Sequence, residues 1–251
     1  MYESGFDSAA AQAHLDRQFA TIDVIQELME RVNRPPAAGS DVARLDSEVG
    51  DTPVTVSKSV HAGLSTATDC LVDIASILRR PDSILTLSSV RSLMRTALLG
   101  ASRAAFVLVP EQHEDRVAAA EVVVRQEWFS LERAFDALSP FEHLPGLVPP
   151  VGFRNEMHDL AKNLPPGRRQ GEERTIREMS EVVARKLSGK EIENEPPSLI
   201  TEALVWIWHS GSGAAHAYGW PRLAGGDFVS DFGMVVPVAH IALDSAVRRW
   251  S

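Results

Sequence analysis

The densest group of side chains that can bind or react lies in the stretch Trp206–Trp220, WIWHSGSGAAHAYGW. It holds three of the five tryptophans and two of the eight histidines, together with a serine flanked by glycines. Aromatic side chains beside a few polar groups are typical of enclosed ligand-binding sites. The stretch therefore predicts where a functional site lies, although it does not assign a reaction.

Helical spacing brings the polar side chains of this stretch together. His209, Ser212 and His216 share one face of a helix, because steps of three, four and seven residues align side chains. A serine one turn from an imidazole can serve as a nucleophile beside its base. However, no acid lies nearby in the sequence, and the strand, elbow and helix of a G-x-S-x-G nucleophile are missing. We therefore interpret these residues as hydrogen-bonding groups rather than as a hydrolase pair.

The histidines do not form a recognised metal motif. Dinuclear carboxylate sites in helical bundles use Glu-x-x-His pairs on two helices. In this sequence no Glu or Asp precedes a histidine by three positions, and H-E-x-x-H is absent. We expect neither a bound metal nor a cofactor.

Three arginines, Arg91, Arg95 and Arg103, follow one another at steps of four and eight along a predicted helix. Guanidinium groups on one face can bind phosphate or carboxylate. Alternatively, they form an exposed basic stripe that pairs with acids on the preceding helix, such as Asp69 and Asp73. The same helix contains a run of small residues that begins at Gly100, which predicts close approach of a neighbouring backbone.

The overall charge disfavours a general nucleic-acid binder. The chain has 34 acidic and 25 basic residues, for a net charge of −9, whereas nucleic-acid binders usually carry a basic excess. The single cysteine, Cys70, excludes an internal disulfide and fits a reducing compartment. No signal peptide and no uncharged apolar run of membrane-spanning length are recognisable. We expect a cytoplasmic protein that does not enter the membrane.

Apolar residues recur at three- and four-residue steps in most of the chain, which predicts an all-α protein. The expected helices cover about residues 8–32, 54–80, 84–109, 110–138, 154–163, 172–188, 198–216 and 234–250. Short turns between consecutive helices force neighbours to run antiparallel. The predicted architecture is an antiparallel multi-helix bundle of about seven to eight helices.

Two segments between these helices have distinct compositions. Residues 34–53 mix proline, glycine and acidic residues without sustained periodicity, which predicts an exposed loop or a short linker. We therefore divide the chain into residues 1–52, an N-terminal helix and loop that pack on the body or on a second copy, and residues 53–251, the helical bundle domain. Residues 139–153 contain four prolines but are too apolar for a free linker, so we expect them to lie across the bundle.

A family resemblance rests on three segments. They are the tryptophan, serine and histidine pattern within Trp206–Tyr218, TDCLVDIASILR at 68–79, and SLMRTALLGASRAAFVLVP at 92–110. Together they resemble a group of all-helical actinobacterial proteins of unknown function, over about residues 60–250. Those proteins are in turn distantly similar to HEPN domains. The resemblance implies a HEPN-like helical fold and a homodimer.

Many HEPN domains are ribonucleases of toxin-antitoxin or phage-defence systems and need no metal. Their signature is an arginine followed, after four to six residues, by a histidine. The nearest match here is Arg154 with His158, which have only three residues between them. The family's helix often carries a glutamate after its arginine, where this chain has Leu99 or Gly100.

The sequence thus supports two hypotheses of different classes. In the first, a bundle without catalytic activity binds a small polar ligand or a protein partner in a pocket lined by Arg95, Trp206, Trp208, Ser212, His216 and Tyr218. In the second, the chain is a HEPN-like ribonuclease in which Arg154 and His158 act on RNA. The first requires Ser212 and His216 to point inward against the arginine-bearing helix.

Overall fold

A computed structural model describes residues 8–80, 86–167, 169–187 and 196–251. Within these ranges the chain forms ten α-helices and one short 3₁₀ turn, and no strand. This result confirms the all-α prediction, although the helices are more numerous than the seven to eight expected. In chain order they are α1 (Ser8–Val32), α2 (Asp41–Val49), α3 (Val56–Leu78), α4 (Leu87–Leu108), α5 (His113–Leu138), α6 (Val151–Ala161), α7 (Glu172–Leu187), α8 (Pro197–Ala215), α9 (Trp220–Leu223) and α10 (Phe228–Trp250).

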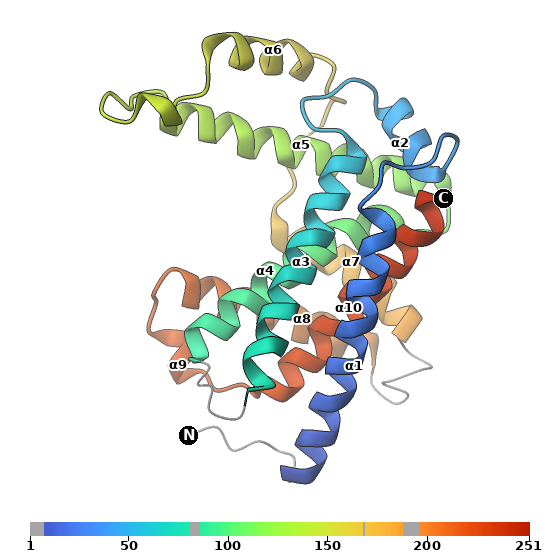
Figure 1. Cartoon of the computed structure of the whole chain (residues 1–251), viewed down its shortest axis with the longest axis vertical. Helices are drawn as coiled ribbons and strands as arrows, with labels where there is room; N and C mark the ends of the chain where they lie inside the picture. The colour runs from blue at the N-terminus through green and yellow to red at the C-terminus, as the bar shows by residue number, and fades with distance from the viewer. Residues whose placement is uncertain (1–7, 81–85, 168, 188–195) are drawn as a thin grey trace.

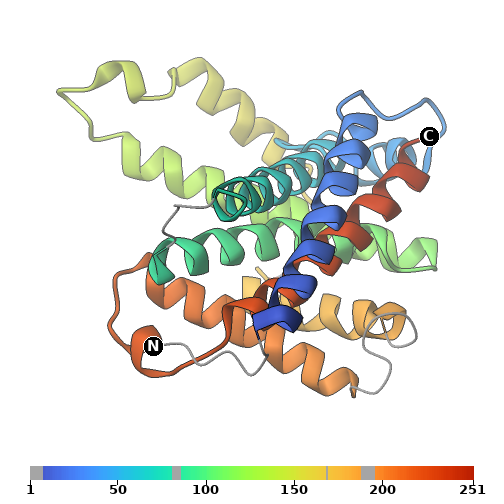
Figure 2. The same cartoon turned by 60° about the horizontal axis from the view of Figure 1, so that its bottom comes forward.

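Helix α4 forms the centre of the bundle. It contacts α3, α5, α7, α8 and α10, while α1 covers α10 and α3 on the outside (Figures 1 and 2). Small residues make this central position possible, because Ala97, Ala101 and Ala104 are completely buried. They let neighbouring helices approach without steric conflict. The arginine-bearing helix of the sequence is therefore the helix on which the others pack.

The closest helix contact in the core joins two glycines. A Cβ atom added to Gly63 of α3 would lie 2.7 Å from the carbonyl oxygen of Gly100 on α4. The predicted close approach at Gly100 is thus confirmed. Its partner, Gly63, was not recognised in the sequence.

The prediction of an exposed loop over residues 34–53 is wrong in its middle part. Residues 41–49 form α2, and its Val42, Leu45 and Val49 are buried. The Oγ atom of Ser40 accepts a hydrogen bond from the backbone N–H of Ala43 at 3.2 Å and caps the helix. With nine residues the helix is too short for its periodicity to stand out among the surrounding acidic residues.

Two further helix boundaries differ from expectation. α5 begins at His113 rather than at Pro110, and the Pro110 carbonyl accepts a hydrogen bond from the Arg116 side chain. α10 begins at Phe228, where Asp227 accepts hydrogen bonds from the backbone of the first turn, and it continues through Pro237. The expected start of a helix at residue 84 and the expected end of another at residue 188 lie outside the described residues.

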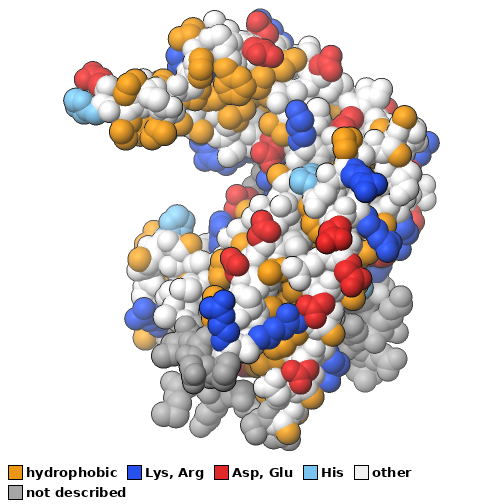
Figure 3. Space-filling view, viewed as in Figure 1, with side chains coloured by type: hydrophobic (Ala, Val, Ile, Leu, Met, Phe, Trp, Pro, Cys, Tyr) orange, Lys and Arg blue, Asp and Glu red, His pale blue; other side chains and the backbone are white. Residues whose placement is uncertain are grey.

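The end of α5 and all of α6 project from the body as an arm, residues 128–163 (Figures 1 and 3). The arm has a small apolar cluster of its own, which contains Trp128, Phe135 and Met157 and is separate from the main core. Residues 139–153 form the tip of the arm and the start of α6 (Figure 1). The expectation that they lie across the bundle is therefore wrong.

Of the described helices, only α10 has the length and composition of a membrane span. Of the apolar stretch of 18 residues that gives α10 this property, 61% is buried inside the bundle. Its apolar side chains therefore form the protein core.

Candidate functional site

Helices α4 and α8 meet through two arginine and tryptophan pairs. The guanidinium carbon of Arg91 lies 5.8 Å from the ring centroid of Trp206, and that of Arg95 lies 5.8 Å from the centroid of Trp208. Both separations are within the range of cation–π contacts. The helices come this close because α8 has Gly211 at the crossing, where a Cβ would lie 2.5 Å from the Arg91 carbonyl oxygen.

Arg95 is held by partners on two other helices. Its Nε donates a hydrogen bond to Ser212 Oγ at 2.6 Å, and a terminal nitrogen lies 3.2 Å from a carboxylate oxygen of Glu172. The predicted convergence of Arg95 and Ser212 is therefore confirmed. These contacts connect α4, α7 and α8 into one unit.

Arg91 is 1% exposed, although arginine is rarely buried. Its guanidinium donates hydrogen bonds to the carbonyl oxygens of Pro221 and Gly225, in and after α9. Arg91 thereby fixes the chain between α8 and α10. This role requires the planar fork of arginine and would not be supplied by lysine.

The alternative of an exposed basic stripe is wrong. Asp69 and Asp73 form no ion pair in the described part of the chain, whereas Arg95 pairs with Glu172 of α7. Arg103 pairs with Glu127 of α5 at 2.5 Å. Each partner comes from a later helix, and such long-range pairing cannot be deduced from helical periodicity.

The expectation that His216 points inward is also wrong. Helix α8 ends at Ala215, so His216 and Tyr218 lie beyond it and are exposed. Their rings are 6.1 Å apart. Ala217 adopts a positive φ of 58°, which turns the chain away from the helix axis. The structure thus brings together Arg95, Trp208 and Ser212 but leaves His216 and Tyr218 outside this group.

His209, which the sequence places on the same helical face as Ser212 and His216, is exposed as well. Its Nε2 lies 3.3 Å from Glu173 of α7. Because the pair is at the surface, it contributes little to stability. No histidine therefore lies close enough to Ser212 to act as its base among the described residues.

Arg154 and His158 lie one turn apart on α6, within the arm. The His158 ring is exposed and packs edge-on against Trp128, with centroids 5.1 Å apart. Nε of Arg154 is buried and makes no hydrogen bond to the described residues. This pair is remote from the contact of α4 with α8 (Figure 1).

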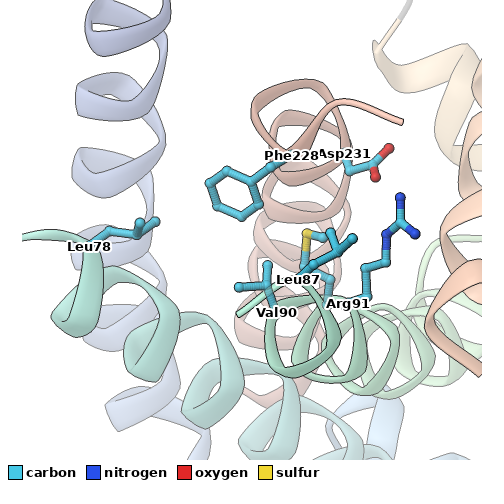
Figure 4. A pocket seen from close by; sticks show the side chains of 7 residues that line it. Leu78, Leu87, Val90, Arg91, Phe228 and Asp231 are labelled. Carbon is cyan, nitrogen blue, oxygen red and sulfur yellow. The ribbon is translucent and has the colours of Figure 1, made fainter. Parts of the chain in front are cut away.

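A pocket of about 250 Å³ opens beside Arg91, between α3, α4 and α10 (Figure 4). Its walls are mainly apolar, and two charged side chains, Arg91 and Asp231, lie at one side. The lining residues are Leu78, Leu87, Val90, Arg91, Met94, Phe228 and Asp231. An apolar cavity with few polar groups has the character of a small-molecule site.

Asp231 is the unusual residue of this pocket. It is 8% exposed, and its carboxylate accepts no hydrogen bond and forms no ion pair within the described ranges. Desolvation raises the pKa of Asp231 to about 6, and Asp227 adds to this effect, while the positive charge of Arg91 opposes it. A carboxylate on a largely buried residue in the wall of an apolar pocket is costly and marks a candidate binding site.

Sequence reasoning missed Asp231. The available signal was an acidic residue in the otherwise apolar stretch FVSDFGMVV, which begins at Phe228. The sequence predicts that the closing helix begins at about residue 234, which places Asp231 in a loop. Its burial follows from α10 starting earlier and packing on α4.

The described residues contain no group of three or more His, Cys, Asp or Glu side chains arranged to hold a metal ion. The chain matches no protein-family model, and no curated protein or solved structure is significantly similar to it.

Proposed function

We propose that this protein binds a small, mainly apolar molecule in the pocket between α3, α4 and α10, without catalysing a reaction. The observation that carries the proposal is Asp231, a residue only 8% exposed that lines the pocket and whose carboxylate has no hydrogen-bond partner in the described part of the chain. Natural proteins retain such destabilising groups mainly where function requires them.

The size of the pocket limits the ligand. A cavity of roughly 150 Å³ accommodates benzene, and this pocket has a volume of about 250 Å³. A ligand of about ten non-hydrogen atoms therefore fits. Phe228, Met94 and the aliphatic side chains would contact its apolar part.

The charges at the pocket's side define the polar group of the ligand. Asp231 requires a hydrogen-bond donor, because an ionised carboxylate only accepts. The nearby positive charge of Arg91 disfavours a ligand ammonium. We therefore propose a ligand with an uncharged donor, either a hydroxyl or an amide group. The pairing of Arg91 with Trp206 supports this account, since it links the predicted tryptophan cluster to the pocket wall.

A matched pair of fluorescent probes tests the proposal. 2-Naphthol carries a hydroxyl donor, and 2-methoxynaphthalene has nearly the same shape but no donor. A hydrogen bond to a charged group contributes about 1.5–3 kcal/mol, so we expect 2-naphthol to bind roughly 10- to 100-fold more tightly at pH 7.5. Equal affinities of the two probes would contradict the proposed head group, and no binding of either would contradict the pocket.

Two variants identify the residue responsible. Asp231→Ala should abolish the preference for 2-naphthol, because it removes the acceptor but keeps the pocket open. Asp244→Ala, on the same helix but half-exposed and paired with Arg248, should keep the preference. Circular dichroism of both variants establishes that they are folded.

A second candidate function, metal-independent RNA cleavage, has support at one other place. Arg154 and the exposed His158 lie side by side on α6, and metal-free cleavage requires a cation near the phosphate and an acid or base near the 2′-hydroxyl. Expression in bacteria should then arrest growth, and Arg154→Ala or His158→Ala should relieve the arrest. Normal growth with intact cellular RNA would contradict this function.

We also propose that the protein is cytoplasmic. The single cysteine, Cys70, is buried and unpaired, which is typical of a reducing compartment.

A further inference from the structure

The tip of the arm exposes an apolar patch. Five large side chains between residues 141 and 153 are 40–62% exposed: Phe141, Leu144, Leu147, Val151 and Phe153. They follow one another along the chain, and Figure 3 shows apolar atoms gathered on the arm. Taking roughly 200 Å² for a fully exposed large apolar side chain, this patch exposes roughly 500 Å². Such an area is typical of an interaction surface.

A second apolar patch lies on the other side of a hollow. The α9 corner, residues 216–224, exposes Tyr218, Trp220 and Leu223, which are 62%, 40% and 88% exposed. The arm and α9 project from the same side of the body, with the hollow between them (Figures 1 and 3). The predicted site residue Tyr218 therefore belongs to an exposed surface rather than to an internal pocket.

The arm has little internal stabilisation. Its own cluster contains three buried apolar residues, and a core of this size contributes little stability. Its base is attached to the body by Asn163, whose side chain donates to the Asp51 carbonyl oxygen at 3.0 Å. Arg125 adds hydrogen bonds to the carbonyl oxygens of Pro165 and Pro166. The base is thus fixed, while the apolar tip has no cover in the described structure.

We propose that both patches are covered by a second copy of this chain, with the arm tip of each copy against the α9 corner of the other. Together the two patches expose on the order of 900 Å² of apolar surface, if a full side chain contributes roughly 200 Å². A stable interface buries about 800 Å² of each partner, so neither patch alone is sufficient. In a two-fold dimer every arm-to-corner contact occurs twice, and both patches are buried at once.

Charge does not favour a nucleic acid or a basic peptide as the occupant. On the body, Arg95 is paired with Glu172 and Arg103 with Glu127. The arm itself carries both signs, for example Arg133 beside Glu132, and Lys162 paired with Asp159. Apolar contact therefore dominates the recognition, and the dimer should resist salt.

Sedimentation of the full chain tests the proposal. The wild-type chain should sediment as a dimer at micromolar concentration, in low and high salt. Leu147→Asp at the arm tip and Leu223→Asp at the corner should each shift it to a monomer, with unchanged helicity. Val24→Asp, a matched change at a 42% exposed position of α1, should remain dimeric. A monomeric wild type, or a dimer insensitive to both substitutions, would overturn the proposal.

Mixing the two variants separates this arrangement from an arm-to-arm contact. In an equimolar mixture of Leu147→Asp and Leu223→Asp, a heterodimer has one arm-to-corner contact in which both patches are native. The mixture should therefore form more dimer than either variant alone at the same total concentration. If it forms no more dimer, arm-to-corner docking is refuted.

Discussion

Asp231 combines a cost to folding with a position in a pocket. The carboxylate lies near Arg91 at the side of a mainly apolar pocket, and burial raises its pKa from 3.8 to about 6. In the folded protein it binds a proton more readily than in the unfolded chain. The contribution of Asp231 to stability is therefore greatest below pH 3.8 and is lost as the pH rises through about 6.

This linkage predicts a difference between the wild type and Asp231→Asn, which has a similar shape but no charge. Between pH 4.5 and pH 7.5 the wild type should lose about 2 kcal/mol of unfolding free energy relative to the variant. Urea unfolding at several pH values measures the difference. Parallel profiles of the two proteins would show that Asp231 is not desolvated.

A second prediction concerns the bond between Arg95 and Ser212. Ser212→Ala removes the acceptor of the Arg95 Nε donor, and we expect a loss of about 1–2 kcal/mol of unfolding free energy. Ser210→Ala is a suitable comparison, because Ser210 is buried on the same helix but bonds only to the Ile207 carbonyl oxygen. Ser210→Ala should therefore lower the unfolding free energy less than Ser212→Ala does. An equal loss in the two variants would refute a special role of the hydrogen bond from Arg95 to Ser212.

At the scale of the helix, the contact of α3 with α4 depends on two glycines. In Gly63→Ala the new methyl group would lie 2.7 Å from the Gly100 carbonyl oxygen. The backbone cannot move aside easily, so we expect a destabilisation of about 1–3 kcal/mol. Thermal unfolding followed by circular dichroism measures it.

Gly152→Ala provides the control for this substitution. Gly152 lies in α6, and nothing lies within 4 Å of an added Cβ. Alanine is the better helix former, so this variant should be neutral or more stable by up to about 1 kcal/mol. A loss in Gly63→Ala no larger than that in Gly152→Ala would contradict the close packing of α3 on α4.

The helices themselves could largely be predicted from the sequence. The recurrence of apolar residues located α1, α3, α4, α7 and α8 to within a few residues of their observed bounds. The short helix α2 was missed, because periodicity needs more than two turns to be recognised. The inward placement of His216 failed because the predicted helix continued past the observed end at Ala215.

The candidate site was only partly predictable for a different reason. Arg95 and Ser212 could be predicted as site residues from their local sequence. Arg95 belongs to a series of arginines on one helix, and Ser212 lies between two glycines in the stretch rich in tryptophan and histidine. By contrast, the burial and the polar contacts of Arg91 and Asp231 depend on groups distant in sequence. Arg91, for example, donates a hydrogen bond to the Gly225 carbonyl oxygen. Helical periodicity indicates which face is buried, but it does not show which polar groups meet.

In the molecule as a whole, the ligand pocket and the arm are separate features. The pocket lies where α3, α4 and α10 meet (Figure 4), whereas the arm extends from the far part of α5. We therefore expect Leu147→Asp to change association without changing the affinity for 2-naphthol. Fluorescence titration of the monomeric variant tests this independence, and a large loss of affinity would indicate coupling between the two sites.

The central claim is that Asp231 receives a hydrogen bond from a ligand in the pocket. The most direct measurement is the pKa of its carboxyl group by carbon-13 NMR, with and without saturating 2-naphthol. A hydrogen bond to the ionised form stabilises that form, so the pKa should fall clearly below its ligand-free value of about 6. An unchanged or higher pKa in the complex would contradict the account.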